Sequence, residues 1–279
     1  MSAVLAVVSS MLWGGADFLG GQLSRRHTAY VVVLRAQVVA VAGLVVALLV
    51  VGDLTPHGPA LLWGALAGVS GVAALGAFYH ALAIGRMTLV APIAATSVAV
   101  PVLLGVALGQ HPSVGQAVGI VVAAGGTILA VGPELRSRQG SQATRSIVLA
   151  LVSALGFGLV LVTIALGSRT SIVQTLLTQR LVYVGVLGVT LLLLPHDHRP
   201  WTRREHVAVA ASGAGDMGAN LLYAEATRSG ILPVTSVLAS LYPIVTALLA
   251  HRFDGERLRR IQYTGVAAAF VGVALLTAG

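Results

Sequence analysis

Four ionisable side chains interrupt apolar runs of the sequence and are the first candidates for chemistry. Asp17 lies in WGGADFLGG, Arg35 in VVVLRAQVV, Arg180 in LLTQRLVYV and Asp216 in SGAGDMGANLLYAEA. Because a charge at membrane depth is costly, such residues usually pair with each other or serve a binding site. Their depths predict two ion pairs, Asp17 with Arg35 and Asp216 with Arg180. We expect the second pair, near the middle of its segments, to bind a polar group of a ligand or a proton.

The glycines around Asp216 match two known motifs. Gly213, Gly215 and Gly218 have the spacing of a dinucleotide fingerprint, but they lie inside an apolar run and no acid follows about 20 residues later. The order G-x-G-D resembles intramembrane aspartyl proteases, in which two aspartates share a proton. An intramembrane aspartyl protease that uses Asp17 and Asp216 is therefore the alternative function. Pairing with arginine argues against it, and we expect the glycines to serve close helix packing.

Softer candidates for a binding cavity are polar or aromatic: Trp13, Tyr79, His80, Asn220 and Tyr223. Single aromatic residues in membrane helices more often pack or anchor at the interface. The run HDH at 196–198 could suggest a metal, but its residues are consecutive and lack ligand spacing. We expect no metal site, and no sequence feature predicts a cofactor.

The elements that must position these residues are membrane helices. Of 279 residues, 57% are hydrophobic and 9% are charged, with a mean hydropathy of +0.92, whereas soluble domains carry about 25% charged residues. Continuous apolar runs of about 20 residues predict helices rather than barrel strands. The fold class is therefore all-α and integral to the membrane. The ten predicted transmembrane helices are 2–24, 29–51, 60–84, 87–109, 113–132, 146–167, 170–194, 205–228, 231–251 and 258–278.

The chain repeats itself at an offset of about 144 residues. AVLAVVSSMLWGG at 3–15 aligns with IVLALVSALGFGL at 147–159. The repeat predicts a five-helix unit over 1–132, a polar connector over 133–145 and a second five-helix unit over 146–279. Because five is odd, the second unit must enter the membrane inverted. Many secondary transporters have this architecture, with a substrate site near the midplane between the halves.

Basic residues indicate how the chain is oriented. The formal net charge is +8 and every basic residue is arginine. The arginines gather in the loops after the first, third, fifth, seventh and ninth runs, which predicts that these loops are cytoplasmic and that both termini lie outside. The positive charge is thus expected to face anionic lipid rather than nucleic acid.

Several segments together resemble the EamA-type drug/metabolite transporter family: LWGGADFLGGQLSRR, FYHALAIGRMTLVAP, LYAEATRSGILPVTSVLASLYP and GERL. The resemblance implies a carrier of two inverted five-helix repeats in the bacterial inner membrane that moves small metabolites, often outward. It also implies a cavity between helices 1, 3, 4, 6, 8 and 9. That would place Trp13, Asp17, Tyr79, His80, Asp216, Asn220 and Tyr223 on cavity-forming helices.

The sequence therefore predicts a secondary transporter rather than an enzyme. We expect it to export small polar metabolites, amino acids or drug-like solutes, by alternating access around a midplane cavity. Its partners would be the metabolite, a coupling proton and membrane lipid.

Overall fold

The computed structural model describes residues 1–84, 93–131, 141–195, 199–253 and 260–278. Within these ranges the chain is helical. The first half contains α1 (Ser2–Ser24), α2 (Ala29–Val51), α3 (Gly58–Ile84), the 3-10 turn η1 (Thr96–Val98), α5 (Ala99–Ala107) and α6 (Val114–Val131). The second half contains α7 (Ser141–Gly167), α8 (Ile172–Leu193), α9 (Arg203–Ser229), α10 (Leu232–Ala239), α11 (Tyr242–Phe253) and α12 (Arg260–Ala278).

The helices are those of a multi-pass membrane protein. Seven described stretches are long and apolar enough to cross a bilayer, and α10 and α11 count together as one of them. Two further apolar stretches, Ile93–Ala107 and Val114–Ala130, are shorter. The 27-residue α9 is long enough but carries more polar residues. The all-helical fold is confirmed, while ten crossings stays a prediction.

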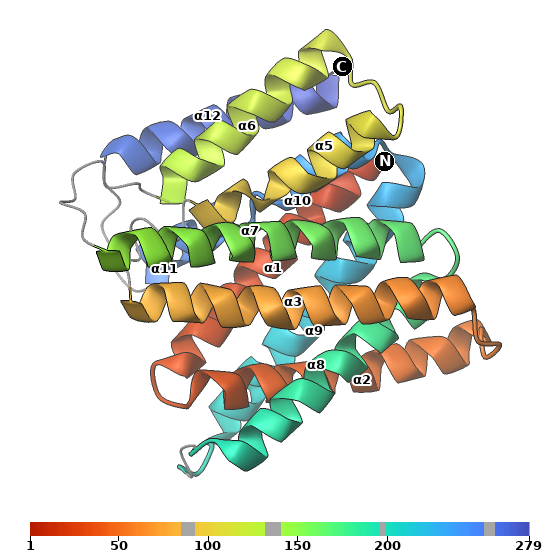
Figure 1. The fold of residues 1–279 in the computed structure, drawn as a ribbon, viewed down its shortest axis with the longest axis vertical. Coiled ribbons are helices and arrows are strands. Elements are labelled where there is room, and N and C mark those ends of the chain that lie inside the picture. The colour runs from red at the N-terminus through yellow and green to blue at the C-terminus, as the bar shows by residue number, and fades with distance from the viewer. Residues whose placement is uncertain (85–92, 132–140, 196–198, 254–259, 279) are drawn as a thin grey trace.

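The two halves run in opposite directions. Helix α1 runs away from the end of the bundle where both termini lie, whereas its repeat partner α7 runs towards that end (Figure 1). The most extensive helix pairings cross between the halves: α6 with α12, α3 with α7, α1 with α9, α3 with α8, α2 with α8 and α2 with α9; α5 also packs against α10. When each helix is replaced by its repeat partner in the other half, every one of these pairings becomes itself or another of them. A pseudo-twofold axis that relates two inverted halves requires this.

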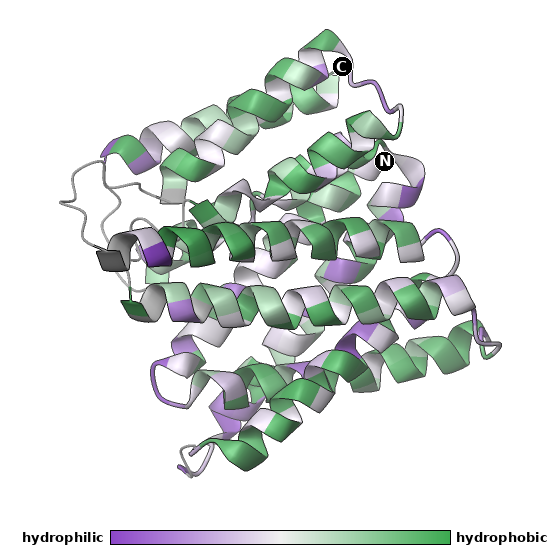
Figure 2. Cartoon of the chain, in the orientation of Figure 1, coloured by the Kyte–Doolittle hydropathy of each residue, from purple (hydrophilic) through white to green (hydrophobic). Residues whose placement is uncertain are grey.

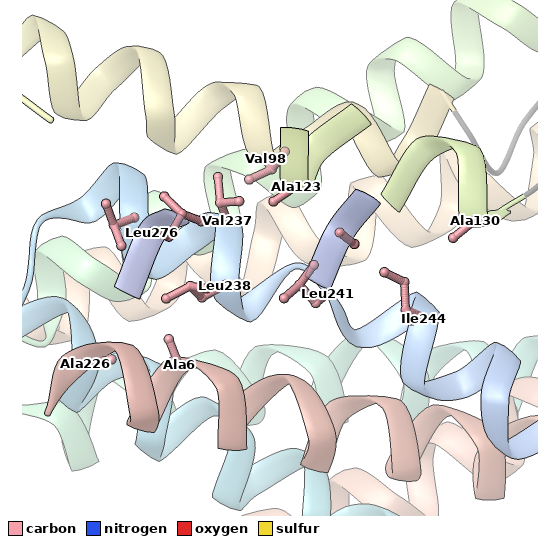
Figure 3. Close-up of a cluster of buried hydrophobic side chains, with 12 residues drawn as sticks. Ala6, Val98, Ala123, Ala130, Ala226, Val237, Leu238, Leu241, Ile244 and Leu276 are labelled. Carbon is pink, nitrogen blue, oxygen red and sulfur yellow. The ribbon is translucent and has the colours of Figure 1, made fainter. Parts of the chain in front are cut away.

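The outside of the bundle is apolar, and α10 is buried along its whole length. Green, hydrophobic residues cover most outward faces (Figure 2), and large side chains such as Leu49, Leu192 and Phe270 are exposed there. Residues of α10 and α11, among them Val237, Leu238 and Ile244, join the main buried cluster (Figure 3). An apolar exterior around a packed interior is expected of a protein whose solvent is lipid.

Small residues allow the helices to approach closely. In the α6–α12 pair, a Cβ on Gly126 or Gly265 would meet backbone atoms of the facing helix. Gly213 of the candidate motif likewise faces the Ala36 backbone of α2, whereas a Cβ on Gly215 would make only an ordinary contact, at 3.6 Å. Gly213 therefore serves the close packing that the sequence predicts.

Candidate functional site

The predicted ion pair between Arg180 and Asp216 is confirmed. Nη1 of Arg180 lies 2.9 Å from Oδ2 of Asp216, and their side chains are 4% and 24% exposed. Arg180 lies in the middle third of α8, and Asp216 lies halfway along α9. The pair is thus placed near the middle of two long helices, where charges are costly unless they are paired.

Both halves of the chain supply further contacts to this pair. Gln37 of α2 accepts a hydrogen bond from Nη1 of Arg180 at 2.9 Å and donates one to Asp216 at 3.4 Å. Trp13 of α1 donates its indole N–H to Oδ1 of Asp216 at 3.1 Å. Asn220, one turn further along α9, donates to the same oxygen at 3.1 Å. We call Trp13, Gln37, Arg180, Asp216 and Asn220 the charged centre.

Sequence reasoning missed Gln37, although a signal was present. Gln37 is a neutral polar residue within the apolar run LRAQVV, and it is buried in α2. A buried amide in a membrane helix needs a hydrogen-bond partner, so it could have been matched to the charged pair. The charge of Arg35, two residues earlier, drew the prediction instead.

Aromatic side chains form one wall beside the charged centre. The ring of Trp13 lies 5.7 Å from that of Tyr223 and 6.1 Å from that of Tyr242. Tyr223 is fully buried and its hydroxyl donates to the Leu161 carbonyl and contacts the Ser236 hydroxyl. Because these hydrogen bonds fix its ring, Tyr223 supports the ring of Trp13 that packs against it. Tyr242, which the sequence did not single out, flanks Trp13 from the start of α11.

Asp17 lies near this wall but not in the predicted ion pair. Asp17 is exposed on α1, four residues after Trp13. It lies within electrostatic range of Asp216 and of Tyr242. Within the described residues no ion pair joins Asp17 to Arg35, and no hydrogen bond joins the two aspartates. The contacts of the described residues thus give no support to a protease dyad.

Arg35 lies elsewhere, because an aromatic ring competes for it. Its guanidinium carbon is 4.2 Å from the centroid of the Trp201 ring, and His27 stacks on that ring at 4.1 Å. Glu205 lies 3.4 Å from Nε2 of His27 and 3.7 Å from Nη1 of Arg26. Cation–π stacking in the first part of α2 thus replaces the ion pair with Asp17 that depth alone predicts. We call Arg26, His27, Arg35, Trp201 and Glu205 the basic-face cluster.

A second polar cluster joins the halves at the opposite end of the bundle. Asp53, in the loop between α2 and α3, accepts a hydrogen bond from Ser171, and its Oδ1 is 2.8 Å from Nε2 of His57. Gln174 donates to the carbonyls of Asp53 and Thr55. The hydrogen bond from Ser171, followed by that with His57, holds the pKa of Asp53 below its ordinary value. We call Asp53, His57, Ser171 and Gln174 the terminal-face cluster.

The remaining sequence candidates are not joined to the charged centre by any described contact. His80 is exposed near the end of α3. The side chain of Tyr79 and residues 196–198 lie outside the described residues.

A groove of about 510 Å³ between α1, α9 and α11 has an apolar lining that includes Leu12, Gly215 and Leu249.

Comparisons with known proteins agree with this architecture. A family model described as the EamA-like transporter family matches residues 1–132 and 144–278. A solved structure titled only as the crystal structure of a protein superposes with a TM-score of 0.83 at 16% identity, covering 99% of this chain and 96% of the other. At that identity the likeness shows the fold alone. No curated protein matches the sequence.

Proposed function

Because the chain belongs to the EamA-like transporter family, we propose that it is a secondary transporter that exports small polar metabolites, such as amino acids or drug-like solutes, across the bacterial inner membrane. The observation that carries this proposal is the charged centre. The ion pair of the second half exchanges hydrogen bonds with Gln37 and receives one from Trp13, both of the first half. A site shared by two inverted halves responds directly to their relative movement.

Asp17 supplies a second role in this proposal. The Asp216 carboxylate already has Arg180 and three neutral donors as partners, whereas no described residue pairs with the Asp17 carboxylate. Asp17 is also exposed, on the same helix as Trp13. It is therefore the carboxylate available to bind a coupling proton or a cationic group of the solute.

The two loop clusters are proposed as the gates of alternating access. His27 and Ser171 occupy equivalent positions at the repeat offset of about 144, and so do His57 and Trp201. Each cluster thus joins the turn after the first helix of one half to the loop before the third helix of the other. Breaking one cluster while the other persists would open the centre to one side only.

The orientation of the carrier follows from its arginines. The residues of the basic-face cluster belong to the turn after α1, the first part of α2 and the residues around the start of α9. These helix ends lie opposite both termini (Figure 1), and Arg25, Arg203 and Arg204 belong to them as well. The positive-inside rule makes that end cytoplasmic. Export then means that solute enters the centre when the basic-face cluster is open and leaves when the terminal-face cluster is open.

A transport screen tests the proposal. The purified protein is reconstituted into liposomes and loaded with a mixture of metabolites, and the efflux of each is measured with and without a pH gradient. We expect a small set of polar solutes to leave these liposomes faster than they leave protein-free liposomes. We also expect a pH gradient to change the rate of their efflux.

Two variants connect the screen to the proposed site. Asp216→Asn should abolish transport, and Asp17→Asn should remove the effect of the pH gradient. Arg228→Lys, which changes an exposed ion pair at the end of α9, serves as the control. The proposal is wrong if no solute moves faster than in control liposomes, or if Asp216→Asn transports as well as the original protein.

A further inference from the structure

Only one of the three guanidinium nitrogens of Arg180 has a hydrogen-bond partner among the described residues. Its Nη1 contacts Asp216 and Gln37, each at 2.9 Å. Its Nε and Nη2 are buried and have no hydrogen-bond partner among the described residues. The whole residue is 3% exposed. Burying the charged donors Nε and Nη2 without hydrogen-bond acceptors is unfavourable. They therefore need an acceptor in some state of the transport cycle.

The two unpaired nitrogens have a definite shape. Nε and Nη2 lie along one edge of the planar guanidinium group, and their N–H bonds are parallel. This fork matches the two oxygens of a carboxylate, which it binds through two short hydrogen bonds. Asp216 and Gln37 contact Nη1, so the edge formed by Nε and Nη2 is buried without a hydrogen-bond partner among the described residues.

We infer that the transported solute carries a carboxylate group, which binds the Nε and Nη2 edge of Arg180. This inference rests on the proposed transport function and names the chemical class of its substrate. Arginine then holds two carboxylates at once, that of Asp216 at Nη1 and that of the solute at the opposite edge.

Packing around Arg180 fixes the orientation of this edge. Its guanidinium carbon lies 5.9 Å from the ring centroid of Tyr183, one turn further along α8. The hydroxyl group of Tyr183 packs against Gly71 of α3, where a larger residue would collide with it. A contact with the face of a ring leaves the edges of the guanidinium group to hydrogen bonding.

Charge balance favours a carboxylate over a phosphate. The single positive charge of Arg180 is already balanced by Asp216, and Asp17 lies within electrostatic range of Asp216. Each added negative charge in this region is repelled by these aspartates. A carboxylate brings one negative charge, whereas a phosphate brings nearly two. An amino acid would compensate its own carboxylate with an ammonium group.

Binding is measured on the purified full-length protein in detergent or nanodiscs, so that transport is not required. The probes are matched acid and amide pairs, leucine with leucinamide and phenylacetate with phenylacetamide, together with inorganic phosphate. We expect at least one acid to raise the melting temperature in a saturable manner, while its amide and phosphate do not. The inference is overturned if amides stabilise as well as acids do, or if neither acid shifts the melting temperature.

Arginine variants assign the effect to this residue. Arg180→Lys keeps the positive charge but removes the fork, so the apparent affinity for the acid should fall by roughly tenfold or more. Arg228→Lys makes the same change in an exposed pair and should leave the affinity unaltered. Equal affinity in Arg180→Lys overturns the inference. If Arg180→Lys does not fold, the acid and amide comparison in the original protein decides.

The two proposals fail in different ways. Saturable acid binding without any solute efflux from liposomes would refute transport and leave the carboxylate site standing. Efflux of solutes that lack a carboxylate, with no stabilisation by either acid, would refute the carboxylate inference and leave transport standing.

Discussion

Replacing Asp216 by asparagine keeps the shape of the side chain and removes its charge. Arg180, 4% exposed, then keeps its positive charge without a counterion among the described contacts. Removing one partner of a fully buried pair costs about 3–5 kcal/mol. Because the Asp216 side chain is 24% exposed, water can reach part of the site, and we expect a loss of ~2–3 kcal/mol in the free energy of unfolding.

The reverse substitution should cost less. In Arg180→Gln the remaining charge is that of Asp216, which is more exposed and keeps Trp13, Gln37 and Asn220 as donors. We expect Arg180→Gln to lose ~1–2 kcal/mol in the free energy of unfolding. The double variant should lose at least about 1 kcal/mol less than the sum of the losses in the two single variants.

Unfolding in mixed micelles with increasing SDS, followed by circular dichroism, measures all three variants. The exposed pair of Arg228 with Glu225, 3.7 Å apart and about half exposed on both sides, is the control cycle and should show a coupling below about 0.5 kcal/mol. The reasoning fails if Arg180→Gln is the more costly single change, or if the central cycle is additive.

Three further predictions test other parts of the structure. Gly213→Ala should destabilise the protein by about 1–3 kcal/mol in the same unfolding assay, because its Cβ meets the α2 backbone, whereas Gly215→Ala should be nearly neutral; equal costs would contradict this packing. The folded-state pKa of Asp53 is lowered from 3.8, so its contribution is present above about pH 4 and is lost as the pH falls through the folded value. A melting profile from pH 7 to pH 3 should therefore fall less steeply below pH 4 in Asp53→Asn, and an unchanged profile would count against the cluster. Because the chain has no cysteine, Ser24→Cys and Thr55→Cys can be labelled in whole cells with an impermeant maleimide; only Thr55→Cys should react, and the opposite result would reverse the orientation.

The sequence by itself determined the membrane class, the two-unit repeat, its inversion and the central ion pair. Long apolar runs have one stable solution in lipid, and an odd number of helices per repeat forces the second copy to invert. A charge at the middle of such a run must find an opposite charge at similar depth, and Asp216 was the carboxylate at the depth of Arg180. These are one-dimensional constraints, so they can be read along the chain.

Only the tertiary structure decided which side chains meet. Arg35 and Asp17 satisfy the same depth argument, but in the folded protein the guanidinium group of Arg35 stacks on the ring of Trp201. Gln37 entered the charged centre because α2 packs against both α8 and α9. The unpaired edge of Arg180 likewise depends on which of its nitrogens face Asp216. The depth of a residue along a helix follows from its number in the sequence. Which neighbour its side chain meets depends on how the helices pack around it, and the sequence does not show this directly.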